Sequence, residues 1–311
     1  MTSIKLEEYS ESKPSVVTVG SFDGIHLGHM KLIEKTISIS KEEGLKSIIL
    51  TFNPHPKVVL NKISNFSFLS TYDEKNTIFK SLDFDFLVVK KFDDAFSKLT
   101  PEEFVRDILV EKLNVKHVVI GYDHHFGKNG DASYKTLNEL SKVYNFKVTQ
   151  IDAYIKDGIS VSSTIIRNYI SKGNFKIANK LLGYEFNITG TVVKGKSRGK
   201  TLGFPTANIV VNPIKILPGN GVYLINSKVF NKSIHGMMNV GQNPTFKDKG
   251  HSIEIHFFDF EKNIYGIKIS VNILKKIREE IKFDSSSELS KQLQEDKKKC
   301  FQIIKSLKKT S

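Results

Sequence analysis

The segment from Val16 to His29, with the sequence VVTVGSFDGIHLGH, constrains the fold of this chain more strongly than any other. Its first four residues are mostly apolar and β-branched, which predicts a short buried strand between Pro14 and Gly20. From Leu27 the apolar residues recur near one helical face as far as Gly44, where we expect the helix to end. The segment therefore predicts a strand that passes through a tight turn into a helix.

The turn of this segment carries the signs of a ligand site. A helix N-terminus presents free backbone N–H groups and about half a positive charge, which favours an anion such as phosphate. The two histidines can donate hydrogen bonds to phosphate oxygens, and a zinc site is disfavoured because no third ligand is evident. We therefore expect nucleotide phosphates at Gly20, Phe22, Gly24, His26, Gly28 and His29.

Length and composition limit the class of protein. A chain of 311 residues is long for a single core, so we expect two domains. The net charge is +14, but only four of the 47 basic residues are arginine, and specific nucleic-acid recognition relies on arginine. We interpret most of the lysines as solvated surface and expect no nucleic-acid partner.

The sequence also bears on the compartment. The lone Cys300 allows no internal disulfide framework and fits a reducing environment, and no apolar run approaches membrane-spanning length. The polar N-terminus lacks the apolar stretch of a secretory signal. We expect a cytoplasmic protein without a membrane partner, present as a monomer or a weak homo-oligomer.

The first half of the chain alternates strand and helix patterns. The clearest helix start is TPEEFVRDILVEKL, with Thr100 as N-cap and Glu103 closing a capping box. Strands are predicted at Val16–Val19, Ser47–Phe52, Asp85–Val89, His117–Ile120 and Lys147–Ile151. This alternation predicts an α/β domain with a Rossmann-like, parallel, doubly wound sheet, in which ligands lie beyond the carboxyl ends of the strands.

From about Asn187 the pattern changes to short strand-like runs separated by glycine, proline and asparagine. The runs ITGTVV, GVYLINSKVF, SIHGMMNVG, SIEIHFFDF and IYGIKISVNI predict a small antiparallel β-barrel. A final helix is expected from near Ser287. We place the boundary in the LLGYEF segment, which gives domains of residues 1–186 and 187–311.

Three further tracts in the first half contain candidate binding residues. Two prolines hold Asn53 on a rigid loop in FNPHP, although a plain turn is the simpler interpretation of that tract alone. GYDHHFGKNGD, which contains Asp123 and Phe126, combines polar, apolar and flexible residues as a binding loop does. In ISVSSTIIR the serines can cap a helix. Ser163, Thr164 and Arg167 would then lie near the positive end of that helix.

The second half contains a tract rich in lysine and glycine, GKSRGKTLGFPTANI, of a kind that can fold over phosphates. The hydroxyl of Thr206 and the amide oxygen of Asn208 are hard ligands suited to Mg²⁺. A basic surface loop followed by a strand also explains the first part of the tract. NVGQNPTF, from Asn239 to Phe246, resembles a second loop over a site. Further phosphate-binding candidates here are Gly195, Gly203 and Pro205.

Two charged residues stand out in the barrel sequence. Glu254 interrupts an apolar strand pattern in SIEIHFFDF, so it is either an ion-pair partner or a general base, a role typically worth about 10²–10⁴ in rate. Arg278, which precedes EEIKF, can bind a substrate or its phosphate, and a structural salt bridge explains it equally well.

These motifs resemble, over nearly the whole chain and in the correct order, those of the bacterial bifunctional riboflavin kinase/FAD synthetase family. GSFDGIHLGH, NPHP, the GYDHHFG loop and SSTIIR are similar to its FAD synthetase (FMN adenylyltransferase) half. GKTLGFPTAN, GVY, NVGQNPTF, IEIHFFDF and IREEIKF are similar to its riboflavin kinase half. HxGH alone is shared by many adenylyltransferases and class I tRNA synthetases, whereas the PTAN tract is far more specific.

The resemblance implies a role for each candidate. Glu254 would deprotonate the ribityl hydroxyl of the flavin, and Mg²⁺ and ATP would be held by Thr206 and Asn208. Adenylyl transfer would be supported by His26, His29, Ser163, Thr164 and Arg167. Contacts to the flavin would come from Asn53, Asp123, Phe126 and Arg278. The chain departs from the family at His125, where arginine is common, and at Lys194, where histidine is common.

The sequence thus leads to the hypothesis of an enzyme that uses ATP and Mg²⁺ to convert riboflavin to FMN and then FMN to FAD. Its partners would be these small-molecule substrates. Three alternatives stay open at this point: only one half is active, an adenylyltransferase or tRNA synthetase fragment acts on another substrate, or a lysine-rich protein binds nucleic acid without flavin turnover. The PTAN tract counts against the second alternative and the scarcity of arginine against the third.

Overall fold

The computed structural model describes residues 1–60, 66–130, 132–195, 199, 202–242 and 251–310. The chain divides into two compact units, Met1–Ser163 and Thr164–Ser311, which are described separately below. The division falls after the first residue of helix α7 (Ser163–Ser171), some twenty residues before the boundary predicted from the sequence. The two-domain organisation is therefore visible, and the functional boundary at residue 186 stays a prediction.

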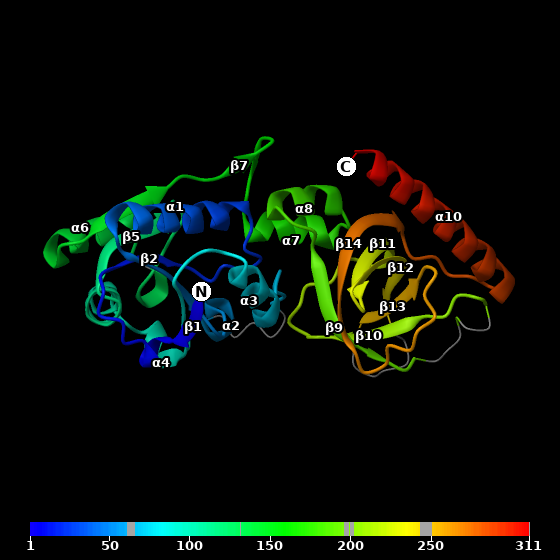
Figure 1. Ribbon diagram of the computed structural model, residues 1–311, viewed down its shortest axis with the longest axis horizontal. Coiled ribbons are helices and arrows are strands. Elements are labelled where there is room, and N and C mark those ends of the chain that lie inside the picture. Colours follow the sequence, from blue (N-terminus) through cyan, green and yellow to red (C-terminus); the bar gives the residue numbers. More distant parts are fainter. Residues whose placement is uncertain (61–65, 131, 196–198, 200–201, 243–250, 311) are drawn as a thin grey trace. The chain divides into compact units, whose positions relative to one another are not determined.

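The first unit is built on a six-stranded, fully parallel sheet in the order β1-β4-β3-β2-β5-β6 (Figure 1). Its strands are β1 (Thr2–Lys5), β2 (Ser15–Val19), β3 (Lys46–Phe52), β4 (Phe86–Lys90), β5 (Val115–Gly121) and β6 (Lys147–Ile151). The helical segments between them are η1 (Leu6–Glu8), α1 (Leu27–Glu43), α2 (Pro56–Leu60), α3 (Tyr72–Lys80), α4 (Asp94–Ser97), α5 (Pro101–Glu103), η2 (Phe104–Lys112), η3 (Lys128–Gly130) and α6 (Tyr134–Tyr144). A small hairpin, β7 (Ile155–Lys156) and β8 (Ile159–Ser160), follows the sheet.

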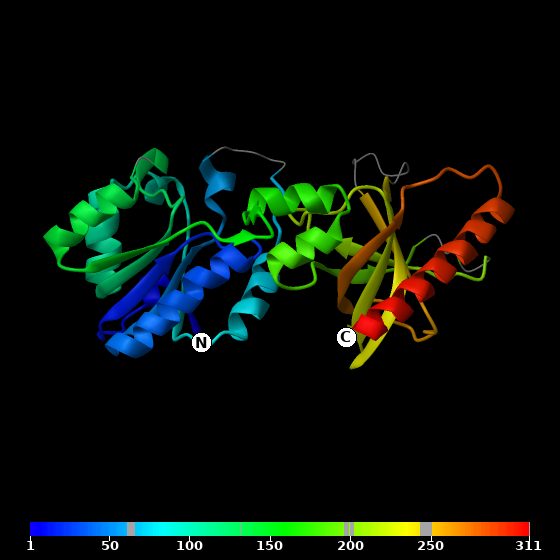
Figure 2. The same cartoon turned by 90° about the horizontal axis from the view of Figure 1, so that it is seen from above.

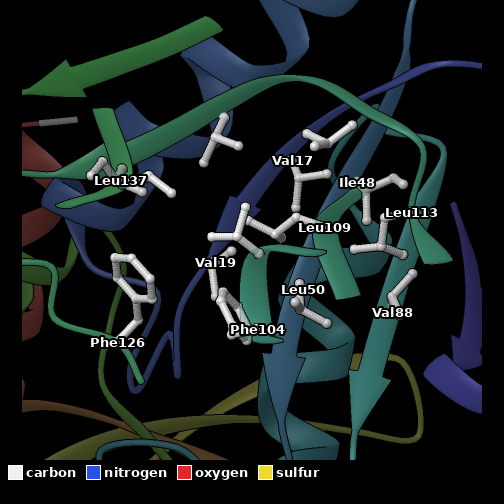
Figure 3. Packing of buried hydrophobic residues seen from close by; sticks show 14 of the residues in the cluster. Val17, Val19, Ile48, Leu50, Val88, Phe104, Leu109, Leu113, Phe126 and Leu137 are labelled. Carbon is white, nitrogen blue, oxygen red and sulfur yellow. The ribbon is translucent and has the colours of Figure 1, made fainter. Parts of the chain in front are cut away.

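The sheet is doubly wound because alternate residues of each strand pack under helices on opposite faces. Ile48 and Leu50 of β3 pack with Leu109 of η2 on one face, and Figure 3 shows these side chains pointing into a shared core. Ile49, between them, packs with Ile33 of α1 on the other face. This two-sided burial explains why the strands are nearly continuous apolar runs.

The local signals read from the sequence are confirmed in this unit. Helix α1 ends at Glu43, and Gly44 caps it in the left-handed region at a φ of +66°. Thr100 and Glu103 form the predicted capping box. We missed one strand of the sheet and the two strands of the hairpin. Strand β1, which pairs in parallel with β4 at the edge of the sheet, is too short and too polar to show a strand pattern, and β7 and β8 have only two residues each.

The second unit is a closed six-stranded barrel in the order β10-β13-β12-β11-β14-β9, with every described pairing antiparallel. Its strands are β9 (Asn187–Val193), β10 (Ala207–Val211), β11 (Gly221–Val229), β12 (Lys232–Gln242), β13 (His251–Phe257) and β14 (Lys268–Arg278). Its helices are α7 (Ser163–Ser171), α8 (Phe175–Leu182) and α10 (Ser286–Thr310). The predicted α/β sheet, antiparallel barrel and terminal helix are all present.

Helix α10 lies along the outside of the barrel, across its strands, as Figure 2 shows. Cys300 and Ile304 of this helix pack with Leu224 and Met237, which belong to the neighbouring strands β11 and β12. Helix α8 is attached to the same unit through Asn179, whose amide donates a hydrogen bond to the backbone oxygen of Ile273 at 3.1 Å.

The core around β3 makes a testable contribution to stability. Leu50 is fully buried, so Leu50→Ala leaves a cavity and should lower the unfolding free energy of the first unit by about 2–5 kcal/mol. Val143→Ala on α6, where the side chain is 72% exposed, is the control and should change it by less than about 0.5 kcal/mol. Urea unfolding followed by circular dichroism suits a chain without tryptophan. Equal effects of the two substitutions would contradict the assigned core.

Candidate functional site

The two strands β2 and β5 mark the place where a ligand site is expected in the first unit. They are neighbours in the sheet, although β3 and β4 come between them in the sequence, and the strand order reverses there. At such a switch point the loops after the two strands diverge and leave a crevice at the carboxyl edge of the sheet. The loop after β2 is GSFDGI, and the loop after β5 contains YDHHFGKNG.

The loop from Gly20 to Ile25 has an unusual backbone. Phe22, Gly24 and Ile25 have positive φ angles of 49°, 85° and 36°. Only glycine adopts such angles without strain. Phe22 and Ile25 are nevertheless almost fully buried, so their packing holds the backbone in this conformation. A Cβ at Gly24 would also collide with Leu69. The structure thus explains by sterics why residue 24 is glycine, and its predicted contact with a phosphate stays a prediction.

Side chains from distant segments hold the same loop. The carboxylate of Asp23 accepts hydrogen bonds from the backbone N–H groups of Leu69 and Ser70, both at 3.2 Å. The hydroxyl of Ser70 accepts one from the N–H of Gly24 at 3.0 Å, and Ser163 donates its hydroxyl to the backbone oxygen of Asp23 at 2.9 Å. The contribution of Leu69 and Ser70 was missed from the sequence, because a contact over 46 residues leaves no local pattern.

His26 and His29 form a stacked pair at the start of α1. Their ring centroids lie 3.6 Å apart with an interplanar angle of 14°. Nδ1 of His26 accepts a hydrogen bond from the N–H of His29 at 3.3 Å and so caps the helix. A nitrogen that accepts carries no proton, so the neutral tautomer of His26 has its hydrogen on Nε2, where it can be donated to a ligand.

His29 is held in its neutral form. Burial lowers its pKa well below 6.5, and His26 and Lys75 lower it further. In the described part of the chain, its Nδ1 is shielded from solvent and has no hydrogen-bond partner. The ring therefore keeps one unused polar atom beside the helix N-terminus.

The helix N-terminus itself can receive an anion. Among the described residues, the backbone N–H groups of Leu27 and Gly28 have no partner within the protein. A Cβ at Gly28 would press against the ring of His26 at 3.2 Å, so glycine allows the imidazole to lie against the backbone. Free N–H groups and the helix dipole beside two histidine rings are the features of a candidate anion site.

The loop after β5 borders an aromatic cavity of about 140 Å³. Buried Phe104 and Phe126 and half-buried Phe52 and Phe96 line it, and the ring of His124 stacks on Phe126 at 6.1 Å. Burial lowers the pKa of His124 to about 4. A flat, mostly apolar ring system fits such a lining.

The other two flavin candidates of the first unit lie outside this cavity lining. Asp123 is exposed on the same loop. Asn53 borders a separate cavity of about 620 Å³ with Tyr72 and residues of β1. Thr164 and Arg167 belong to the second unit, so their convergence with His26 stays a prediction.

In the second unit, one register row crosses the barrel and brings the candidate residues together. Asn208 of β10 pairs with Glu254 of β13, which pairs with Asn239 of β12. Asn239 pairs with Val222, which pairs with Arg278 of β14. Directly paired residues point to the same face of a sheet, so these side chains share one face. Asn239 is a further candidate residue, which we placed only within a loop.

The PTAN tract is anchored to the strand of Glu254. His256, two residues after Glu254, bonds through Nδ1 to the backbone oxygen of Pro205 at 2.9 Å. A Cβ at Gly195 would collide with the amide of Asn208, so glycine allows the backbone to approach that amide. In the described part of the chain, Thr206, Asn208 and Glu254 have no side-chain hydrogen-bond or ion-pair partner. Gly203 has a φ of +79° just before Phe204.

Arg278 forms a buried ion pair. Its Nε lies 2.9 Å and its Nη2 2.8 Å from Oδ2 of Asp296, whose side chain on α10 is fully buried. Nη1 donates to the backbone oxygen of Glu279 at 2.9 Å. The structure therefore contains the salt bridge that was one interpretation of Arg278. A contact between Arg278 and a flavin stays a prediction. Residues 243–246 of NVGQNPTF and residues 196–198, 200 and 201 of the lysine-rich tract lie outside the described residues.

Comparisons with known proteins match both units. The family model described as FAD synthetase matches residues 8–165, and the one described as riboflavin kinase matches residues 182–304. The chain is 39% identical to a "Bifunctional riboflavin kinase/FMN adenylyltransferase" of Buchnera aphidicola subsp. Schizaphis graminum, covering 93% of this chain and 95% of the relative. It is 36% identical to a protein of the same name from Bacillus subtilis, covering 96% and 95%.

A solved structure has the same fold. A crystal structure from Streptococcus pneumoniae, titled as a macrolide-efflux protein, is 31% identical and has a TM-score of 0.88, covering 96% of this chain and 98% of that one. In the described part of this chain, no helix is both long and apolar enough to cross a membrane.

The ion pair of Arg278 predicts a large loss of stability. Asp296→Ala removes the carboxylate and leaves the guanidinium partly buried without its partner, which should destabilise the second unit by about 3–5 kcal/mol. Glu295→Ala, at the exposed neighbouring position, is the matched control and should cost less than about 0.5 kcal/mol. Thermal unfolding of both variants measures the difference, and similar midpoints would contradict a stabilising role of the pair.

The neutral histidines predict that acid destabilises the first unit. The unfolded chain binds protons near pH 6.5, whereas folded His29 and His124 do not, so stability is full above pH 6.5 and falls as the pH drops towards 4. Each histidine contributes a slope of up to about 1.4 kcal/mol per pH unit. Urea unfolding at several pH values should show a flatter slope for His124→Gln and an unchanged slope for the control, Val143→Ala, which changes an exposed side chain without a titratable group. Identical slopes for wild type and His124→Gln would contradict the burial of a neutral ring.

Proposed function

The chain belongs to the family of bifunctional riboflavin kinase/FMN adenylyltransferases, and we propose that its two domains perform the two reactions at separate sites. The protein phosphorylates riboflavin with ATP to give FMN and ADP, and it adenylylates FMN with a second ATP to give FAD and pyrophosphate. We assign adenylylation to residues 1–186 and phosphorylation to residues 187–311.

One observation carries the assignment of the kinase site: Glu254 lies in a register row between two asparagines, with no partner for its carboxylate among the described residues. A carboxylate of this kind is available to accept a proton. In our proposal Glu254 takes the proton of the terminal ribityl hydroxyl as its oxygen attacks the γ-phosphorus of ATP. The bond from that phosphorus to the β–γ bridging oxygen breaks, and ADP leaves.

The same row fits a magnesium ion. Thr206 and Asn208 offer a hydroxyl and an amide oxygen, hard donors with no partner in the described part of the chain. The amide of Asn208 lies against the backbone of residue 195, which is possible only because that residue is glycine. We propose that Thr206 and Asn208 hold Mg²⁺, which when bound neutralises charge on the ATP phosphates. Gly195, Gly203 and Pro205 would keep the PTAN backbone close to those phosphates.

Adenylylation needs stabilisation of phosphate charge more than it needs a nucleophilic side chain. We propose that the phosphates of ATP bind at the N-terminus of α1, over the free N–H groups of Leu27 and Gly28. Nε2–H of His26 and the ring of His29 would then donate to the charge that develops on the α-phosphate. Arg167, Ser163 and Thr164 complete this site in our proposal. The phosphate oxygen of FMN attacks the α-phosphorus, and pyrophosphate leaves.

The aromatic cavity beside Phe126 is the proposed place for the flavin ring that accepts the adenylyl group. The low pKa of His124 keeps its ring uncharged at neutral pH, which suits stacking with a flat heteroaromatic ring. Asp123 and Asn53 would contact the remainder of FMN, and Arg278 would contact riboflavin in the kinase domain.

We further propose that these reactions take place in the cytoplasm. The chain has a single cysteine, Cys300, which is buried, and such sparse use of cysteine is typical of a reducing compartment. The partners in this proposal are ATP and the flavins, and the chain acts as a monomer or a weak homo-oligomer without nucleic acid.

The two-site proposal is tested by separating the steps with single substitutions. Wild-type protein with riboflavin and Mg-ATP should produce FMN first and FAD later, as measured by chromatography of the flavins. Glu254→Gln removes the proton acceptor and should slow FMN formation by about 10²–10⁴ while FAD still forms from supplied FMN. His29→Ala should show the reverse pattern, with FAD formation slowed by about 10²–10³.

Each variant serves as the control for the other, because each leaves one domain unchanged. Loss of both steps in both variants would contradict two separate sites. A wild-type protein that forms neither flavin product would contradict the proposed function itself.

A further inference from the structure

Lys75 is a buried cation that contacts the loop from Gly20 to Ile25. It lies on α3 with 8% of its surface exposed, and its ammonium donates a hydrogen bond to the backbone oxygen of Ser21 at 2.9 Å. Burial lowers its pKa, and the nearby charge of Asp23 only partly opposes this effect. A buried lysine normally has a carboxylate partner that offsets the cost of removing its charge from water.

Lys75 lacks such a partner. Among the described residues no carboxylate lies within ion-pair distance of its ammonium, and Asp23 uses both carboxylate oxygens to accept the N–H groups of Leu69 and Ser70. The ammonium has three N–H groups, of which one is used on Ser21. The fold therefore maintains an incompletely compensated positive charge at a site to which the sequence assigned no lysine.

The surroundings of this charge are those of the adenylyl-transfer site. Its field reaches His29 strongly enough to lower the pKa of that ring. The carbonyl that it holds belongs to a loop in which Phe22, Gly24 and Ile25 have positive φ angles, so this backbone needs external support. The same loop leads into the free N–H groups at the start of α1. An anion bound there would supply the missing counter-charge.

We propose that Lys75 is a positioning residue for adenylyl transfer, an inference that rests on the proposed function of the first domain. By holding the carbonyl of Ser21, its ammonium fixes the loop that orients His26 and His29. Its positive charge also favours the anionic phosphates of ATP at the N-terminus of α1. A lysine with only a packing role would be replaceable by a side chain of the same length without charge.

Lys75→Met makes that replacement. FAD formation from supplied FMN should fall by about 10–100-fold, the effect of a small misplacement of reacting groups. We expect a lower kcat and a higher KM for ATP, while the KM for FMN and the formation of FMN from riboflavin stay unchanged. Lys80→Met, at an exposed position on the same helix, is the matched control and should behave as wild type.

The titration of His29, followed by NMR, separates a role of the charge from a role in packing. The charged or titratable groups that act on His29 are His26 on its own helix and Lys75 on α3, with Asp23 beside Lys75. Lys75→Met should raise the pKa of His29, whereas Lys80→Met should leave it unchanged. Lys75→Arg keeps the charge and should keep both a low pKa and most of the FAD formation.

Two outcomes would overturn the inference. The first is a folded Lys75→Met variant whose kcat and KM for ATP lie within twofold of wild type. The second is a folded Lys75→Arg variant as impaired as Lys75→Met with the titration of His29 unchanged in both, which would leave only a packing role. If Lys75→Met does not fold, the arginine variant alone decides: near-normal kinetics support the inference, and a loss equal to that of His29→Ala overturns it. A wild-type protein that makes no FAD would instead refute the proposed function.

Discussion

Burial of the parallel sheet on both faces is the constraint on which the first unit depends. Helices α1 and α3 cover one face, and η2 and α6 cover the other, so the strand interiors are mostly apolar, and the candidate site residues lie beyond the strand ends. Parallel strands also bring those ends to one edge. The reversal of strand order between β2 and β5 then separates two loops at that edge, and both carry the polar and glycine residues of the candidate site.

The barrel achieves a similar concentration of polar groups by register. Closing six strands fixes which residues lie side by side, and one row places Asn208, Glu254 and Asn239 together on the face that also contains Arg278. His256 ties the PTAN backbone to the strand of Glu254, while the ion pair of Arg278 with Asp296 ties β14 to α10. The first contact thus connects β13 to the PTAN tract, and the second connects β14 to the terminal helix.

Local signals in the sequence predicted much of this fold, because caps, turns and strand periodicity depend on neighbours in the chain. The left-handed cap at Gly44 and the capping box at Thr100 are examples. The missing parts depend on distant contacts. The bonds from Leu69 and Ser70 to Asp23 cross 46 and 47 residues, and the pairing of Arg278 with Asp296 requires the docking of α10. The short edge strand β1 was missed because four mixed residues have no measurable period.

The difference between the two candidate sites follows from the two nucleophiles. A primary hydroxyl is a weak nucleophile that must lose its proton, so a kinase site needs a free base, the role we propose for Glu254, which has no partner among the described residues. The phosphate of FMN is already largely ionised at neutral pH and needs no base. At the start of α1 the carboxylate of Asp23 is accordingly committed to backbone N–H groups, and Lys75 donates to the carbonyl of Ser21 in the same loop. A site without a free base but with a buried lysine suits the meeting of two anions, in which repulsion between phosphates is the main barrier.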